Sequence, residues 1–84
     1  MPRFYLHLYN RIGTVPDEEG EELPDLSGAR ESAFEAIRDI VSEEAKHGTI
    51  DLRGRIEIAG EGSGLLAVVP FSEAIEVHLE RDEQ

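Results

Sequence analysis

A single long segment with helical periodicity constrains the fold of this chain more than any other feature. It runs from Gly28 to about His47, and its apolar residues recur every three or four positions, as in a helix that buries one face. These apolar positions are Ala29, Ala33, Phe34, Ala36, Ile37, Ile40, Val41 and Ala45. With 84 residues in total, the chain has room for one small core, so we predict a single domain over residues 1–84.

The ends of this helix carry recognisable start and stop signals. Ser27 or Asp25 is expected to cap the N-terminus, and Glu31 is expected in the first turn, where its charge suits the helix dipole. Gly48 follows two basic residues, and glycine readily adopts the left-handed conformation that often ends a helix. The helix is therefore predicted to end just before Gly48.

Segments with strand-like patterns flank the helix on both sides. Residues 3–9 alternate, with Phe4, Leu6 and Leu8 on one face and Tyr5, His7 and Tyr9 on the other. Residues 14–15 are expected to pair back on this strand until Pro16 ends the ladder. After the helix, residues 55–59 and 65–69 form a predicted hairpin around the glycine-rich turn 60–64. Residues 71–79 fit either one helical turn or an extended segment, and residues 80–84 are expected to fray.

The resulting β-β-α-β-β order predicts a two-layer α+β domain, with one helix packed on a largely antiparallel sheet. One helix covers one face of the sheet. The other face, with Tyr5, His7, Tyr9 and part of residues 65–69, is then left open. Because residues 65–69 are apolar on both sides, that strand needs cover on both sides. We therefore expect the open face to be an interface.

The charge balance limits the classes of partner. There are 19 acidic residues against 8 Lys and Arg, a formal net charge of −11, which repels nucleic acid and anionic membrane surfaces. Four arginines, Arg3, Arg11, Arg53 and Arg55, are expected to balance local acids. No apolar run approaches the ~20 residues of a membrane span and no signal peptide is evident, so we expect a cytoplasmic protein. The absence of cysteine excludes disulfides and thiolate chemistry.

The densest charge feature is the acidic segment 16–25, which lies between two prolines. Its carboxylates are Asp17, Glu18, Glu19, Glu21, Glu22 and Asp25. The calcium-loop pattern is not met, because with Gly20 as its central glycine the first and last ligand positions fall on Val15 and Leu26. We therefore interpret the segment as a solvated loop that favours the helix N-terminus, with docking of a basic partner as the alternative.

Motifs for metal or covalent chemistry are weak. His7, His47 and His78 are far apart in the chain and lack zinc-ligand spacing, so no metal site is predicted. No G-x-S-x-G motif is present, and the glycine-rich segment 60–64 lacks the lysine of a phosphate-binding loop. We predict no catalytic residue and no cofactor. His7 with Tyr5 and Tyr9 is instead a candidate binding patch, since surface aromatic residues are enriched in interfaces.

Several segments together resemble a family of small bacterial proteins of unknown function. They are Met1-Pro2-Arg3-Phe4-Tyr5-Leu6-His7, the acidic segment from Pro16 to Leu26, Asp51-Leu52-x-Gly54-Arg55-Ile56-Glu57, and Val69-Pro70-Phe71. The resemblance covers nearly the whole chain and implies the same β-β-α-β-β layout. It implies no activity, substrate or cofactor. It also implies that His7 and the acidic segment form a shared feature.

Three hypotheses about function follow. The first is a non-catalytic binding or regulatory module that forms a homodimer through the open sheet face or an edge strand. The second is an acidic partner of a basic protein, an antitoxin-like component or a mimic of nucleic-acid charge, acting through Asp17–Asp25. The third is an enzyme or metal-binding protein centred on Tyr5, His7 and the acidic segment.

Overall fold

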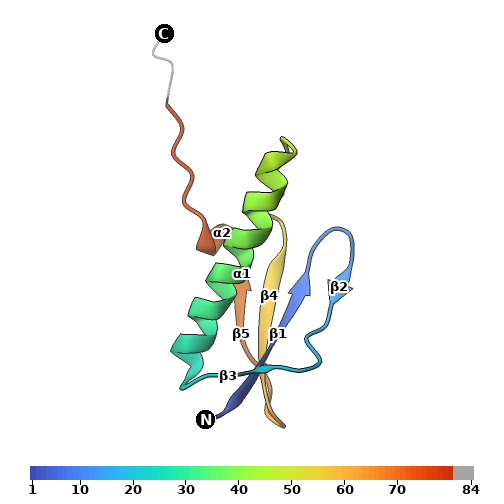
Figure 1. The fold of residues 1–84 in the computed structure, drawn as a ribbon, viewed down its shortest axis with the longest axis vertical. Helices are drawn as coiled ribbons and strands as arrows, with labels where there is room; N and C mark the ends of the chain where they lie inside the picture. Colours follow the sequence, from blue (N-terminus) through green and yellow to red (C-terminus); the bar gives the residue numbers. More distant parts are fainter. Residues whose placement is uncertain (81–84) are drawn as a thin grey trace.

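The structure is a computed structural model that describes residues 1–80. Its elements are β1 (Arg3–Tyr9), β2 (Thr14–Val15), β3 (Glu21–Glu22), α1 (Leu26–Lys46), β4 (Arg55–Gly60), β5 (Gly64–Pro70) and α2 (Phe71–Ala74). The strands form one five-stranded antiparallel sheet, and α1 runs along one face of it (Figure 1). The predicted α+β fold is confirmed, with the short strand β3 and the single helical turn α2 added to the expected order.

Helix α1 begins at Leu26, and Asp25 is its N-cap: the Asp25 carboxylate accepts a hydrogen bond of 2.9 Å from the Gly28 N–H. Asp25 was thus the correct alternative, because Ser27 already lies inside the helix. The expectation that Glu31 lies in the first turn is wrong, because the earlier start places that residue further along the helix. The stop signal is confirmed, since Gly48 has a φ of +87° directly after the C-cap.

The register of the sheet decides which side chains meet the helix. The strand order is β2-β1-β4-β5, and β3 also pairs with β1, near its start. In the β1–β4 pairing, Leu6 lies opposite Ile58 and Leu8 opposite Ile56. Val69 of β5 in turn lies opposite Ile56. Because directly opposed residues share a face, these apolar side chains all point towards α1.

The core lies between this sheet face and α1. Its buried side chains are Phe4, Ala29, Ala33, Ile37, Val41, Ile56, Ile58, Val69, Phe71 and Ala74. Small alanines on α1 allow the helix to approach the sheet closely. Ile37, Ile58, Val69 and Phe71 are the largest fully buried side chains, and each contributes roughly 1.5–3 kcal/mol of hydrophobic stabilisation. The whole core therefore lies on one side of the sheet.

The C-terminal part leaves this core. Helix α2 buries Phe71 and Ala74, after which residues 75–80 have no regular structure and extend away from the sheet (Figure 1). The ambiguous segment 71–79 thus contains the helical turn as well as the extended chain that were expected. The predicted fraying concerns mainly residues 81–84, which lie outside the described residues. Within residues 1–80, no helix is both long enough and apolar enough to cross a membrane.

Candidate functional site

The structure brings His7 of β1 together with Asp17 of the acidic segment. The backbone N–H of Asp17 donates a hydrogen bond of 3.0 Å to His7 Nδ1. Since Nδ1 accepts this bond, a neutral His7 ring holds its proton on Nε2. The rings of Tyr5 and His7 lie stacked on the same face, with centroids 6.4 Å apart and an angle of 11° between their planes. The resemblance implies that His7 and the acidic segment form a shared feature, and in the structure they are joined by this contact between β1 and the loop.

The Asp17 carboxylate accepts a main-chain hydrogen bond from β1 that a neighbouring strand would otherwise accept. Its Oδ2 accepts a hydrogen bond from the Leu6 N–H at 3.1 Å, and its Oδ1 accepts one from the Gly20 N–H at 3.0 Å. Partial burial raises the pKa of Asp17, but the main-chain hydrogen bonds from Leu6, Gly20 and Glu19 outweigh this effect, so the pKa is lowered overall. The carboxylate is thus held in its charged form to close a gap between β2 and β3.

The loop around Gly20 fits tightly against β1. Gly20 has a φ of +74°, and a Cβ there would lie 2.9 Å from both Arg3 Cγ and Tyr5 Cε2. Arg3 holds the same loop, because its guanidinium donates to the Glu19 carbonyl at 2.8 Å and pairs with the Glu22 carboxylate at 3.1 Å. Glycine is therefore required at this position both by the backbone conformation and by the close approach.

Most of the acidic segment is occupied by contacts within the fold. Besides Asp17 and Asp25, Glu22 pairs with Arg3, and the Glu21 carboxylate accepts a hydrogen bond of 2.8 Å from the Ser32 hydroxyl on α1. Glu18 and Glu19 are exposed. The segment is solvent-exposed, as interpreted from the sequence, because five of its six acidic residues are exposed. In addition, four of its six carboxylates hold the segment to β1 or α1.

The sheet face opposite α1 has a polar end and an apolar end. At the polar end, the Arg55 guanidinium stacks over the Tyr9 ring at 4.4 Å and pairs with Glu57 at 2.8 Å. At the other end, Ala59 lies opposite Leu65. The predicted patch of Tyr5, His7 and Tyr9 does lie on this face, and all three side chains are half-buried.

Strand β5 forms one edge of the sheet and carries several exposed apolar side chains. It contains no charged residue over its seven positions. Its exposed side chains are Leu65 at 59%, Leu66 at 42% and Val68 at 41%. The expectation that this strand is apolar on both sides is confirmed, and residues 1–80 provide cover for one side alone.

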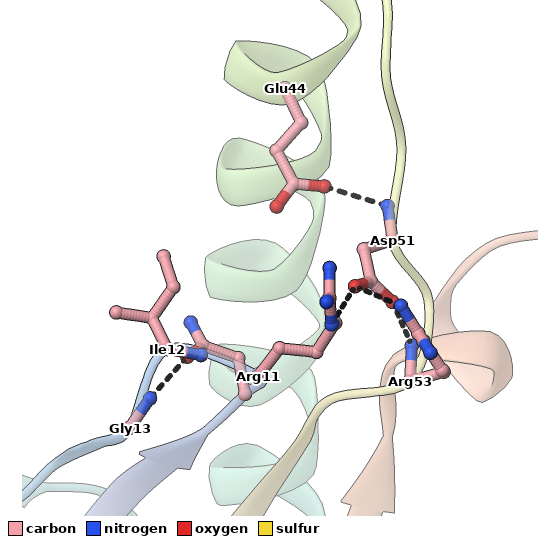
Figure 2. Close-up of polar contacts among 7 residues, drawn as sticks. Arg11, Ile12, Gly13, Glu44, Asp51 and Arg53 are labelled. Atoms are coloured by element: carbon pink, nitrogen blue, oxygen red, sulfur yellow. Dashed lines mark hydrogen bonds and ion pairs between the residues drawn. The ribbon is translucent and has the colours of Figure 1, made fainter.

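A second cluster, which sequence reasoning did not single out, lies where α1 ends. Asp51 is flanked by Arg53, with an Nε–Oδ1 distance of 3.0 Å, and by Arg11, with an Nε–Oδ2 distance of 3.6 Å (Figure 2). The hydrogen bonds from Arg53 and the charges of both arginines lower the pKa of Asp51 to about 2. Glu44 of α1 accepts a hydrogen bond from the Asp51 N–H at 3.0 Å. This cluster lines an open groove of about 620 Å³.

Four arginines outside the helices each pair with a nearby carboxylate. Arg11 and Arg53 pair with Asp51, Arg3 with Glu22 and Arg55 with Glu57, as the expectation of local charge balance required. The short spacing of Asp51 and Arg53 was a usable signal for their pairing. Arg11 carried no such signal, because it is distant from both in the chain.

The possible metal ligands of residues 1–80 do not converge on one point. Among these residues, no group of three or more histidine, aspartate or glutamate side chains is arranged to hold a metal ion. His7 lies against the acidic segment, whereas His47 pairs with Glu43 at 3.5 Å and His78 lies near Glu76 at 3.6 Å. The three histidines thus lie at separate places in the fold.

Comparison with known proteins places the chain in a family whose function is not known. No curated protein and no solved structure matches it. Residues 3–72, which include β1 to β5, α1, the acidic segment and the His7–Asp17 contact, match the domain of unknown function DUF6894. The resemblance to a family of small proteins of unknown function is therefore confirmed, and the chain belongs to the DUF6894 family.

Proposed function

We propose that this protein is a non-catalytic binding module that associates with a second copy of itself through strand β5. The observation that carries this proposal is the exposed, uncharged edge formed by Gly64–Pro70. An edge strand presents unpaired main-chain N–H and C=O groups, and folded proteins usually protect such edges with charges or cover them. In β5 the exposed side chains are Leu65, Leu66 and Val68, which are suited to burial against another chain.

The charge distribution supports a second copy as the occupant. Two chains of net charge −11 repel each other over most of their surface. Strand β5 itself adds no repulsion, because it carries no carboxylate, and Glu57 on the neighbouring strand is paired with Arg55. The same net charge supports the exclusion of nucleic acid and anionic membranes as partners.

The engagement of the titratable groups supports a non-catalytic role. Asp17 accepts two main-chain hydrogen bonds, His7 accepts one, and Asp51 is held between two arginines. Each of these groups stabilises the position of a loop. The contacts that they make are those of structural residues, and they support the proposal of a binding protein.

Sedimentation velocity over a range of concentrations and salt tests the proposal. We expect a monomer–dimer equilibrium that shifts towards dimer as salt rises, because salt screens the repulsion between two acidic chains. Val68→Lys adds a charge to the edge and should return the chain to monomer. A wild-type chain that stays monomeric at concentrations on the order of tens of micromolar contradicts the proposal.

A second candidate function is capture of a basic protein by the acidic segment. The observation that favours it is the exposure of Glu18 and Glu19 at the surface of the loop. Such a complex weakens as salt rises, in contrast to the self-association above. Charge reversal of Glu18 and Glu19 should abolish it and leave the dimer of β5 intact, so the two functions are separable by one pair of variants.

A further inference from the structure

The segment Ile75–Leu79, which follows α2, has the pattern of a β-strand without a strand partner in residues 1–80. Ile75, Val77 and Leu79 alternate with Glu76 and His78. Ile75 has extended dihedral angles, φ −126° and ψ 130°, and packs against the core. By contrast, Val77 is 60% exposed and Leu79 is 82% exposed. Two apolar side chains at strand spacing are therefore left in water.

The fold directs this segment away from its own sheet. Helix α2 follows β5 immediately, and two contacts fasten it to α1. Arg38 Nε donates to the Ala74 carbonyl at 3.0 Å, and Arg30 pairs with Glu73 at 2.9 Å. Beyond α2 the chain extends away from the sheet (Figure 1). The anchored turn thus separates the segment from the edge of β5 in the same molecule.

We propose that Ile75–Leu79 of one copy pairs with the β5 edge of a second copy, and that the exchange is reciprocal. This inference rests on the proposed self-association and names the segment that mediates it. An extended segment that adds to an exposed sheet edge gains main-chain hydrogen bonds, and alternate side chains enter apolar contacts. Val77 and Leu79 supply those apolar side chains, and Leu65 and Val68 supply the surface that receives them.

A reciprocal arrangement buries more surface than a one-way contact, which favours a stable dimer. A specific interface buries roughly 1,200 Å² or more, which is beyond the contact of one short strand with one edge. Twofold exchange doubles that contact, because each copy gives one segment and receives one, as in isologous dimers. It also covers the apolar edge and the apolar tail in one interface.

The first test uses substitutions in the tail of the full chain. Because Val77 and Leu79 are exposed, the double variant Val77→Asp/Leu79→Asp should leave the melting temperature of the monomer unchanged. The dimer dissociation constant should rise roughly tenfold or more, because both apolar contacts are lost in each tail. The matched control Glu76→Gln/His78→Gln alters the intervening positions and should dimerise at least as well as the wild-type chain.

The outcomes separate this inference from the proposed function. If the double variant dimerises as tightly as the wild-type chain, the tail is not the partner of β5, and self-association itself still stands. If the wild-type chain is monomeric, the proposed function fails first and this inference fails with it. If the wild-type chain dimerises, and if Val68→Lys and Val77→Asp/Leu79→Asp each abolish the dimer, the proposed function and this inference are both supported.

The second test uses cysteine cross-linking. Because the chain has no cysteine of its own, each disulfide must involve the introduced residues. A Val77→Cys chain is mixed with an isotope-labelled Val68→Cys chain under mild oxidation, and mixed disulfide dimers are identified by mass. We expect the mixed dimer to form faster than in a control mixture of Val77→Cys with Ile12→Cys. Ile12 is 97% exposed in the turn between β1 and β2, far from β5 in the sheet order. Equal rates in the two mixtures would overturn the inference.

Discussion

The two long edges of the sheet are treated in opposite ways. Along the outer edge of β1, the chain provides β3 beside Arg3 and Phe4, the Asp17 carboxylate at Leu6, and β2 beside Leu8 and Tyr9. Along β5, residues 1–80 provide no such cover, and the strand is apolar and uncharged. One edge is sealed within the molecule, whereas the other remains available for pairing.

The acidic segment and β5 thus differ in how far their edges of the sheet are protected. The acidic segment closes an edge with charged groups, which also discourage a second strand from pairing there. Within residues 1–80, strand β5 has neither a cover nor charges, and the proposed self-association uses that edge. The predictions below test whether the closed edge depends on the contacts described and whether the open edge is dispensable for folding.

The largest effect is expected from Gly20→Ala on the closed edge. The left-handed φ costs an alanine about 1–2 kcal/mol, and crowding against Arg3, Tyr5 and the Phe4 carbonyl adds to this cost. We expect a total loss of about 3 kcal/mol in the free energy of unfolding, measured by urea denaturation.

Gly62→Ala is the matched control for this variant. Gly62 has a similar φ of +70°, but nothing lies within 4 Å of its added Cβ. Its loss should therefore be about 1 kcal/mol, from the backbone conformation alone. Equal losses for the two variants would show that the close approach of the loop to β1 contributes little.

The next effect is expected from Asp17→Asn, which replaces one of the two accepting carboxylate oxygens by a donor. We expect a loss of about 2 kcal/mol near neutral pH, because hydrogen bonds to a charged group are lost. Glu18→Gln, at an exposed neighbour, should change the free energy of unfolding by less than about 0.5 kcal/mol.

The difference in stability between the wild-type chain and Asp17→Asn should depend on pH in one direction. Because the pKa of Asp17 is lowered below 3.8 in the folded chain, its stabilisation is complete above pH 3.8. The stabilisation is then lost as the pH falls through the folded pKa. The wild-type chain and Asp17→Asn should therefore converge in stability at low pH. A constant difference down to that range would contradict the assigned hydrogen bonds.

A smaller effect is expected from Arg3→Gln, which removes the contacts of the Arg3 guanidinium with Glu19 and Glu22 in the loop around Gly20. The ion pair with Glu22 is largely exposed, so its loss should cost about 0.5 kcal/mol in chemical denaturation. High salt should reduce the difference between the two chains, because it screens the pair. A salt-independent difference would indicate that the bond to the Glu19 carbonyl dominates.

The smallest effect on folding is expected from Val68→Lys on the open edge. Val68 is 41% exposed and points away from the core, so the free energy of unfolding of the monomer should change by less than about 0.5 kcal/mol. Dilute thermal denaturation measures this quantity in the absence of dimer. A large destabilisation would mean that the open edge contributes to the fold of the single chain.

The fold was largely predictable because its elements follow local patterns. The apolar spacing from Ala29 to Val41 and the alternation in β1 and β4 report burial on one face, and the structure places those faces on the core. Strand β3 was not predictable, since two glutamates in a loop carry no strand pattern. Its pairing depends on the position of the loop beside Arg3 and Phe4.

The contacts at the candidate sites were harder to predict, because they do not follow local residue patterns. The contact of Asp17 with His7 and Leu6 uses main-chain groups, which every residue has, so no residue pattern marks it. The cluster of Arg11 and Asp51 joins distant parts of the chain. By contrast, the exposed apolar β5 was predictable, because the sequence indicates a single long helix and a strand that is apolar on both sides.

Hydrogen exchange at several protein concentrations tests the central claim most directly. The amide of Leu6, bound to the Asp17 carboxylate, should exchange slowly and at the same rate at all concentrations. Amides along β5 should become more protected as concentration rises, because a second chain pairs with that edge. Protection of β5 that does not change with concentration, or protection that instead changes along β1, would contradict this account.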